Sequence, residues 1–187
     1  FQKTRKVTPY QYRYIFNYCT FSYSMAFWDW EQWERLIDWM AMNGINMPLA
    51  PMGQEIIWQR VYKKYGVSEE ELKDFFVGPA YNAFGRMGCI DGFGGPLPQS
   101  WIENENILQK KILQRERQLG MTPVLQGFTG HVPPALVKKN PGLKFTNLTI
   151  SGTKGTVKIE FTISGTSTNI RAPFQFSQSF GSDASLR

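Results

Sequence analysis

The sequence predicts an α/β fold with a parallel sheet, followed by a short β-rich tail. Short apolar stretches alternate with amphipathic helical stretches, and the turns from helix to strand are short, which is typical of β/α units. The composition changes abruptly near Asn140, because all six Trp, all eight Tyr and all seven Met of the 187 residues precede it. We therefore divide the chain into residues 1–140 and a tail over residues 141–187. Three β/α units fit either part of an eight-unit barrel or a smaller open sheet.

The first unit begins with residues 12–20, whose aromatic and β-branched side chains are typical of a strand. Asp29 can cap the helix that follows, and Gly44 can end it, because Gly adopts the left-handed conformation of a helix C-terminus without steric cost. The apolar positions of this helix recur at the helical spacing, at Trp33, Ile37 and Met40.

The second unit begins with a short buried strand over residues 45–50 and continues with a helix over residues 54–65. Ser68 and Glu71 have the spacing of a capping box at the start of another short helix. Residues 85–98 contain five Gly and two Pro and are predicted to be a loop.

A second capping box is predicted at Ser100 and Glu103, opening a long helix that ends near Gly120. A third strand is expected over residues 121–128. In the tail, apolar and polar residues alternate over residues 157–163, which predicts a half-buried strand. Residues 143–150 can supply its partner strand, and the polar residues after 164 are expected to form no regular structure.

The charge pattern excludes several classes of function. The net charge is +6, but the basic residues are scattered beside acidic ones such as Glu69, Glu103, Glu105 and Glu116, which predicts solvated helix faces rather than a nucleic-acid surface. No apolar run reaches the roughly 18 to 20 residues of a membrane span. One His and two Cys make no metal site, and no phosphate-loop spacing indicates a cofactor. Whether Cys19 and Cys89 form a disulfide is left open by their spacing.

Polar and aromatic side chains gather where function is expected in an α/β fold, on the loops after the strands and on the Gly-rich loop. Sugars suit such a site, because their C–H faces stack on rings while their hydroxyls need paired donors and acceptors. For Glu55 a role at a helix N-terminus, and for the Trp cluster a role in the core, are the alternatives. The candidate residues are Asn17, Cys19, Thr20, Tyr23, Gln54, Glu55, Asp91, Phe93, Thr129 and His131.

Five runs of the sequence together carry a specific resemblance: YRYIFNYCTFSYSMAFWDWEQWERLIDWMAMNGINMPLA (12–50), GQEIIWQRVY (53–62), GPAYNAFGRMG (78–88), GGPLPQSW (94–101) and LGMTPVLQGFTGHVPPAL (119–136). They closely resemble the α-N-acetylglucosaminidases, which form glycoside hydrolase family 89. The resemblance covers residues 10–139 and implies the first three or so units of a (β/α)8 TIM barrel. It also implies retaining hydrolysis of terminal α-linked N-acetylglucosamine by two Glu, about 5 to 5.5 Å apart.

The resemblance places both catalytic Glu residues of the family after the GHVPPA segment, where this chain has no matching strands. The catalytic residues are therefore unknown, and the chain alone is expected to be an inactive fragment. Its substrate-binding residues are expected to be Asn17, Cys19, Tyr23, Gln54, Glu55, Phe93 and His131. Phe93 stands where the lysosomal member has Trp, so stacking is expected without an indole donor. The implied partner is a glycan ending in N-acetylglucosamine, such as heparan sulfate, and the implied location is secreted, periplasmic or lysosomal.

Two alternatives from other classes remain. The aromatic pocket and the β-rich tail also fit a carbohydrate-binding module without catalysis. A structural half-barrel subunit is the other, because a sheet of three parallel strands leaves edges that can pair with further barrel segments or with a second copy.

Overall fold

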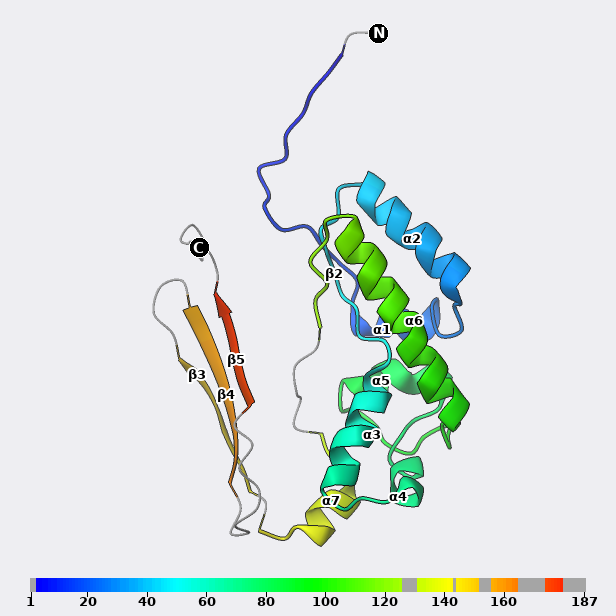
Figure 1. Ribbon diagram of the computed structural model, residues 1–187, viewed down its shortest axis with the longest axis vertical. Coiled ribbons are helices and arrows are strands. Elements are labelled where there is room, and N and C mark those ends of the chain that lie inside the picture. The colour runs from blue at the N-terminus through cyan, green and yellow to red at the C-terminus, as the bar shows by residue number, and fades with distance from the viewer. Residues whose placement is uncertain (1–2, 126–130, 143, 152–155, 165–173, 180–187) are drawn as a thin grey trace. The chain divides into compact units, whose positions relative to one another are not determined.

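The computed structural model describes residues 3–125, 131–142, 144–151, 156–164 and 174–179. The chain forms two units, Phe1–Pro133 and Pro134–Arg187, so the structural division falls a few residues before the change in composition. Figure 1 shows the elements of both units. The first unit contains β1 (Tyr14–Ile15), α1 (Tyr18–Tyr23), α2 (Trp30–Met42), β2 (Met47–Pro48), α3 (Gln54–Lys64), α4 (Glu69–Lys73), the 3₁₀ helix η1 (Pro79–Tyr81), α5 (Asn82–Arg86) and α6 (Gln99–Gln118). The second contains α7 (Pro134–Lys139), β3 (Lys144–Ser151), β4 (Thr156–Ser164) and β5 (Phe174–Ser179).

Three extended segments of the first unit run parallel, with β2 in the middle. Ile15 of β1 lies opposite Pro48 of β2 in a parallel pair. On the other side Leu49 forms a parallel bridge with Val124, and the N–H of Val124 donates to the carbonyl of Pro48 at 2.8 Å. Neighbouring strands that follow one another in the chain, joined by helices, are the arrangement that β/α units produce.

The first predicted strand is much shorter in the structure, because a helix begins inside it. The side chain of Asn17 accepts from the backbone N–H of Thr20 at 3.1 Å and from its hydroxyl at 2.9 Å, so Asn17 caps α1. The prediction of a strand over residues 18–20 was wrong, since this local cap stabilises helix. The capping box predicted at Ser100 was also wrong: α6 begins at Gln99 after Pro98, and no side chain caps it.

The other helix signals are confirmed. Asp29 accepts from the backbone of Gln32, and the Gln32 side chain accepts in return from the Asp29 N–H, which makes a capping box. Ser68 and Glu71 form the predicted capping box of α4. Gly44 follows α2 with φ 74°. Each of these signals involves residues close to one another in sequence.

The core of the first unit lies between α2, α1, the strands and α6, and Figure 1 shows α2 and α6 running side by side. Its buried members are Phe21, Met25, Trp33, Ile37, Met40, Leu49, Met52, Ala83, Ile112 and Met121. At the edge of this interface Arg115 of α6 donates to Asp38 of α2 at 2.8 Å. Trp33, Ile37 and Met40 are thus core residues, as the helical spacing predicts.

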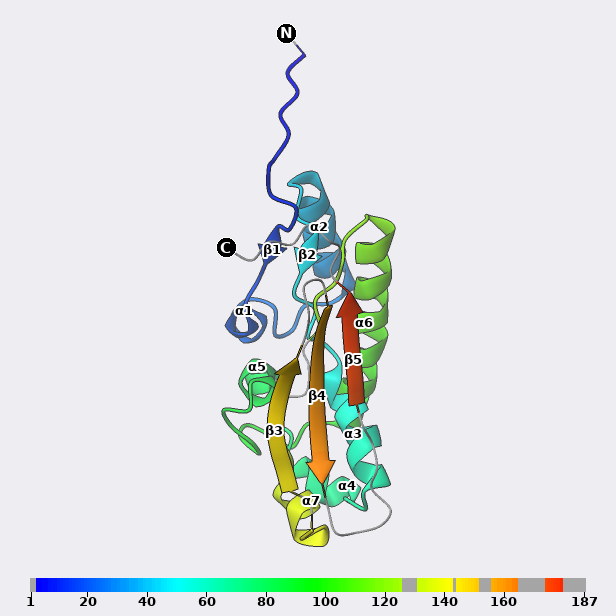
Figure 2. The ribbon, with the colours of Figure 1, turned by 90° about the vertical axis from the view of Figure 1, so that its left-hand side faces the viewer.

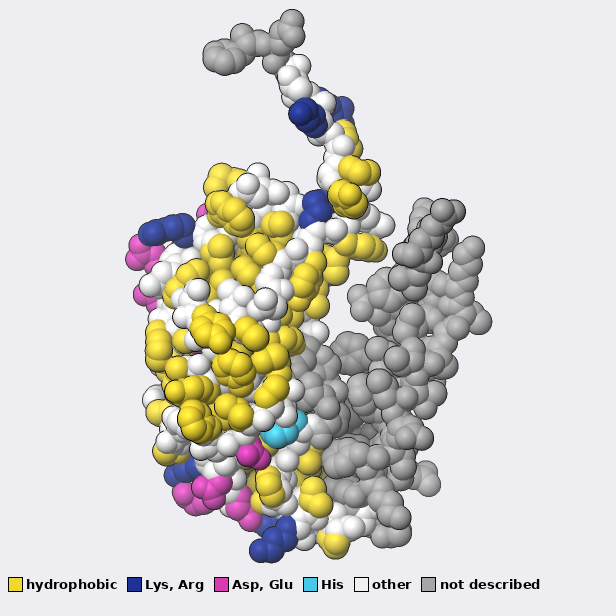
Figure 3. Space-filling model, turned by 180° about the vertical axis from the view of Figure 1, so that it is seen from behind, with side chains coloured by type: hydrophobic (Ala, Val, Ile, Leu, Met, Phe, Trp, Pro, Cys, Tyr) yellow, Lys and Arg dark blue, Asp and Glu magenta, His cyan; other side chains and the backbone are white. Residues whose placement is uncertain are grey.

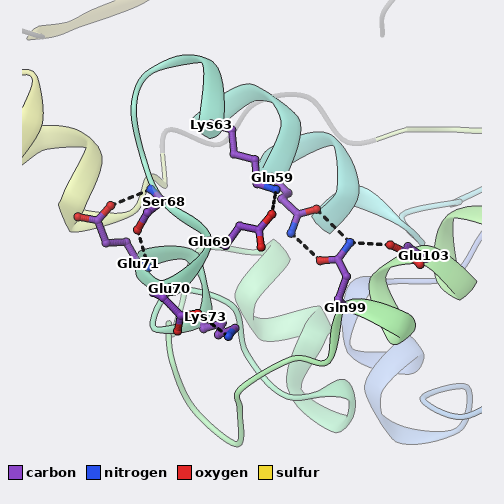
Figure 4. A network of polar contacts seen from close by, with 9 residues as sticks. All are labelled: Gln59, Lys63, Ser68, Glu69, Glu70, Glu71, Lys73, Gln99 and Glu103. Carbon is purple, nitrogen blue, oxygen red and sulfur yellow. Dashed lines mark hydrogen bonds and ion pairs between the residues drawn. The ribbon is translucent and has the colours of Figure 1, made fainter.

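Polar contacts join α3 to α4 and α6, as Figure 4 shows. The side-chain amides of Gln59 and Gln99 bond each other at 2.8 Å, and Gln99 also donates to Glu103 at 3.0 Å. Lys63 forms an ion pair with Glu69. These contacts tie the end of the Gly-rich loop, where α6 starts, to the helix that follows β2.

The inner face of α6 departs from the sequence expectation. Glu105 and Glu116 were predicted on solvated faces, but both are buried, with exposed fractions of 6% and 1%. They share one stripe with Gln109 and Ile112, because the four positions recur at helical spacing. The prediction failed because charge composition does not tell which face of a helix carries each charge.

The second unit is a three-stranded antiparallel sheet with β4 in the middle, as Figure 2 shows. The predicted strand over residues 157–163 and its partner are confirmed as β4 and β3. The expectation of no regular structure after 164 was wrong for β5, which pairs with β4, with Phe176 opposite Ile159. A six-residue strand with polar alternate residues gives a weak sequence signal, and its pairing with β4 stabilises it.

Candidate functional site

Two of the predicted polar residues, Asn17 and Gln54, lie where helices begin after the carboxyl ends of β1 and β2. α1 begins directly after β1, and α3 begins at Gln54, four residues beyond Ala50. The α1 helix packs against α5, where the Ser22 hydroxyl accepts from the backbone N–H of Ala83 at 3.0 Å. The Gln109 side chain on α6 donates to the carbonyl of Ala50 at 2.7 Å. The end of β2 is therefore fixed against α6 by a buried hydrogen bond.

A buried ion pair joins α3 to α5. Arg86 donates from Nε and Nη2 to the two carboxylate oxygens of Glu55 at 2.8 and 2.9 Å, and the side chains are 1% and 6% exposed. A third Arg86 nitrogen lies 3.5 Å from the sulfur of Met52. Two parallel charge-assisted bonds fix both side chains in one geometry. Glu55 is therefore committed to Arg86 through both of its oxygens.

Glu105 adds a second carboxyl group to this interior cluster. Burial raises the pKa of Glu105 to about 7; the positive charge of Arg86 opposes the shift and the negative charge of Glu55 adds to it. Its Oε2 atom is buried and has no hydrogen-bond partner among the described residues. One guanidinium thus lies near two carboxyl groups, and a proton on Glu105 makes the cluster neutral.

His131 lies in the same pocket as Glu55. Its ring stacks on Phe75 with centroids 5.0 Å apart, and its carbonyl accepts from the buried hydroxyl of Tyr62 at 3.2 Å. The ring nitrogen Nε2 is buried without a partner in the part of the chain that the structure describes. The structure thus brings His131 together with Glu55, Arg86 and Asn82 around one small pocket.

The Gly-rich loop is anchored by its backbone. The N–H of Gly78 donates to the carbonyl of Phe93 at 2.8 Å, and a Cβ placed on Gly78 would lie 1.9 Å from the carbonyl oxygen of Gly94. No side chain fits in this contact. Phe93 itself is 56% exposed and meets the ring of Tyr81 edge-on, with centroids 4.7 Å apart. The loop therefore presents a ring to solvent from a fixed backbone.

The predicted residues on the first loop do not join the pocket of His131. The side-chain oxygen of Asn17 caps α1. Tyr23 is 77% exposed, and its ring meets that of Phe84 edge-to-face with centroids 6.4 Å apart. Cys19 is half-buried and Cys89 exposed, and both thiols are free, so the question of a disulfide is answered. None of Asn17, Cys19 and Tyr23 is among the described residues lining that pocket.

Sequence reasoning missed Arg86 and Asn82, which line the pocket, and misjudged Glu105. Arg86 could have been found from the sequence, because it is the charged residue in a run of mostly small and aromatic side chains over residues 78–88. Asp91 is exposed, and Thr129 lies outside the described residues. Among the residues described, no cluster of three His, Cys, Asp or Glu could hold a metal, and no helix is long and apolar enough to cross a membrane.

The surface of the first unit is rich in apolar side chains on one face, as Figure 3 shows, with few charges between them. Exposed rings from separate elements contribute to the surface of this unit, among them Tyr23, Phe27, Tyr81 and Phe93.

Comparisons with known proteins agree with this architecture. Residues 13–168 match the α-N-acetylglucosaminidase TIM-barrel domain family. Human α-N-acetylglucosaminidase is 51% identical over 143 residues, which are 76% of this chain and 19% of the human protein. The family 89 glycoside hydrolase from Clostridium perfringens, solved in complex with 2-acetamido-1,2-dideoxynojirmycin, is 45% identical with a TM-score of 0.71, over 75% of this chain and 16% of that one.

A second structure of the Clostridium perfringens enzyme has the same identity, TM-score and coverage. In it two Glu are replaced by Gln, and the substrate GlcNAc-α-1,4-galactose is bound. This chain therefore spans less than a fifth of the length of these relatives. The family match continues beyond Asn140 to residue 168, so it includes β3 and β4 as well as the first unit.

Proposed function

Because the chain belongs to the α-N-acetylglucosaminidase family and carries part of its TIM-barrel domain, we propose that it supplies the first three β/α units of a family 89 glycoside hydrolase. The enzyme removes terminal α-linked N-acetylglucosamine from glycans such as heparan sulfate. The observation that carries the proposal is the parallel order of β1, β2 and the segment at Val124, with Glu55 and His131 around one pocket. Active sites of such barrels lie at the carboxyl ends of the strands.

The substrate-binding role is assigned to the residues on these loops. Gln54, His131 and Phe93 are proposed to contact the sugar, with Phe93 stacking on its C–H face. Glu55 contributes by shaping the pocket, since both of its carboxylate oxygens are bonded to Arg86. Asn17, Cys19 and Tyr23 belong to the same proposal on the side of α1. The Clostridium perfringens relative binds a disaccharide with terminal GlcNAc, which supports this substrate class.

The chemistry requires two carboxylates flanking the glycosidic bond, one as nucleophile and one as general acid and base. We place both on parts of the hydrolase that follow this segment. Glu55 is held in an ion pair, and Glu105 and Glu116 are buried on α6, so none of the three has a free carboxylate at the sugar. The relative whose two Glu were changed to Gln and which then held its substrate supports a two-Glu reaction.

A chimera tests the proposal. Residues 13–168 of this chain replace the matching segment of the Clostridium perfringens enzyme, and hydrolysis of an aryl α-N-acetylglucosaminide is measured. We expect turnover, and we expect none when the two Glu of the host are changed to Gln. A chimera with a cooperative thermal transition that neither hydrolyses the glycoside nor binds 2-acetamido-1,2-dideoxynojirmycin would contradict the proposal.

The chain alone is proposed to lack turnover, because the oxocarbenium-like transition state needs both carboxylates. The purified chain is assayed on the same aryl glycoside, with Glu55→Gln as the matched control. If the chain turned over the glycoside faster than Glu55→Gln does, this segment would contain a catalytic carboxylate, and the proposal would be wrong.

A second candidate, sugar binding without catalysis, rests on the exposed ring of Phe93 against Tyr81. Titration of the chain and of its Phe93→Ala variant with N-acetylglucosamine distinguishes this candidate. A binding module is favoured if the chain binds the sugar, Phe93→Ala abolishes the binding, and the chimera shows no hydrolysis. The half-barrel alternative requires self-association, so a chain that sediments as a monomer argues against it.

A further inference from the structure

A second pocket, which His131 does not line, lies between α1, α5 and α6. Arg86 and Asn82 line both pockets, whereas Ser22 of α1 and Trp101 and Glu105 of α6 line this one. It has room for a group of about the size of one water molecule. Its polar groups therefore decide what it can hold.

Two of these polar groups have no partner in the described parts of the chain. The indole Nε1 of Trp101 and the Oε2 of Glu105 are both buried atoms without a hydrogen bond. The two residues are four positions apart on α6, so they lie on the same face, one turn from each other. The Trp101 ring is packed edge-on against Phe27, with centroids 5.8 Å apart. An unpaired buried polar atom is costly, so two such atoms on residues that line one pocket favour a bound group.

The chemistry of the pair selects that group. The indole N–H can only donate, so the group must carry an acceptor lone pair, which a metal or ammonium ion lacks. Glu105 can accept when ionised and can donate or accept when protonated, so an anion would be repelled in one state. An apolar group would leave both atoms unpaired. A hydroxyl oxygen, which accepts and donates, matches both atoms in either state of Glu105.

We propose that Trp101 and Glu105 form a binding site for one hydroxyl group, which accepts from the indole N–H and bonds the Glu105 carboxyl. A hydroxyl of this kind belongs either to an internal water or to a sugar, and the site has the same polar chemistry for both. Buried waters commonly make two to four hydrogen bonds of this sort and act as part of the structure. The site does not depend on the hydrolase proposal, because water fills it in the absence of any glycan.

The chain contains its own control. The Nε1 of Trp33 is likewise buried and unpaired among the described residues, but the residue one turn further along α2 is Ile37, which has no polar atom. Trp33 is packed in the apolar core against Phe21, with centroids 5.8 Å apart. The hydroxyl site is therefore expected at Trp101 and absent at Trp33.

Nuclear magnetic resonance of the ¹⁵N-labelled full chain tests the proposal. The indole N–H signals are assigned by their loss in Trp101→Phe and Trp33→Phe. In buffer alone we expect a cross-relaxation signal between water and the Trp101 indole proton, with none at Trp33. If a glycan hydroxyl replaces the water, GlcNAc-α-1,4-galactose removes that signal and shifts the Trp101 resonance in a saturable way; if the site holds only water, the disaccharide leaves both unchanged.

Variants of Glu105 complete the test. Glu105→Leu is expected to abolish the signal at Trp101, whereas Glu105→Gln, which keeps an oxygen acceptor and gains donors, is expected to retain it. The Trp33 resonance reports whether each variant is folded. Three results would overturn the proposal: no water or sugar signal at Trp101, an equal signal at Trp33, or a signal that persists in Glu105→Leu.

Discussion

The two ends of the inner face of α6 bury a carboxyl group in different ways. At one end Glu105 lies in a cluster with the positive charge of Arg86. At the other end Glu116 is 1% exposed, and neither of its oxygens has a partner among the described residues. Burial raises the pKa of Glu116 to about 8, with only the charge of Arg117 opposing. The comparison teaches that both carboxyl groups are kept neutral by a proton, and that the charge of Arg86 makes the proton of Glu105 the easier one to lose.

Removing the positive charge should produce the largest effect. Arg86→Met leaves the carboxylate of Glu55 buried without its partner, and we expect the free energy of unfolding to fall by about 3–5 kcal/mol. Urea unfolding followed by tryptophan fluorescence measures this, since all six Trp lie in the first unit.

The double variant Glu55→Met with Arg86→Met is the matched control. It replaces the pair by apolar side chains, so most of the lost stability should return. A double variant as unstable as Arg86→Met would mean that Arg86 acts through packing and not through charge.

Rising pH should destabilise the first unit through the retained protons. In the unfolded chain both Glu ionise near pH 4.5, whereas in the folded chain Glu105 keeps its proton to about pH 7 and Glu116 to about pH 8. The stability that depends on protonated Glu105 and Glu116 is fully present below pH 4.5 and is lost progressively as the pH rises to about 8. Each unit of raised pKa is worth about 1.4 kcal/mol, so we expect the free energy of unfolding to fall by several kcal/mol, measured by urea unfolding across this range. The reference is Glu105→Gln with Glu116→Met, in which the decrease should disappear; an equal decrease there would show that other groups cause it.

Replacing the unpaired acid should stabilise the protein. Glu116→Met keeps an unbranched side chain of similar length and removes two buried polar oxygens, so we expect a gain of about 2 kcal/mol at pH 8. The gain should shrink as the pH falls below 4.5, where the wild-type carboxyl is protonated in both the folded and the unfolded chain. A loss of stability at pH 8 would mean that Glu116 has a charged partner in the folded protein.

The smallest effect is expected at the ion pair between Arg115 and Asp38. Both side chains are about a third exposed or more, at 33% and 40%, so water and salt weaken their attraction. Arg115→Met should change the free energy of unfolding by less than about 1 kcal/mol. This variant also matches Arg86→Met in chemistry, so a similar loss in both would refute the role of burial.

Local signals were sufficient for much of the helical framework. The caps at Asp29 and Ser68 involve residues three positions apart, and the structure contains both. The strands were overestimated, because the Asn17 cap is as local as a strand pattern and competes with it. The order of the parallel segments follows from β/α alternation, but their number in a complete barrel does not.

The site was harder to predict, because its contacts join distant positions. Glu55 and Arg86 are 31 positions apart, and no spacing rule pairs them. Composition placed Glu105 among solvated charges, although the helical period places it on the face of Ile112. His131 was chosen as a candidate from its motif, and the stacking of its ring on Phe75 became visible only in the structure.

The contact between Gly78 and Gly94 anchors the Gly-rich loop through its backbone, while the side chain of Phe93 stays exposed. This attachment is made by main-chain atoms, so the exposed side chain at position 93 can be exchanged without breaking it. The aromatic side chain at position 93 can therefore change between Phe and Trp while the backbone attachment of the loop stays the same. A substitution at position 93 is therefore expected to leave the fold intact, whereas any side chain introduced at Gly78 would clash with the Gly94 carbonyl and break the attachment of the loop.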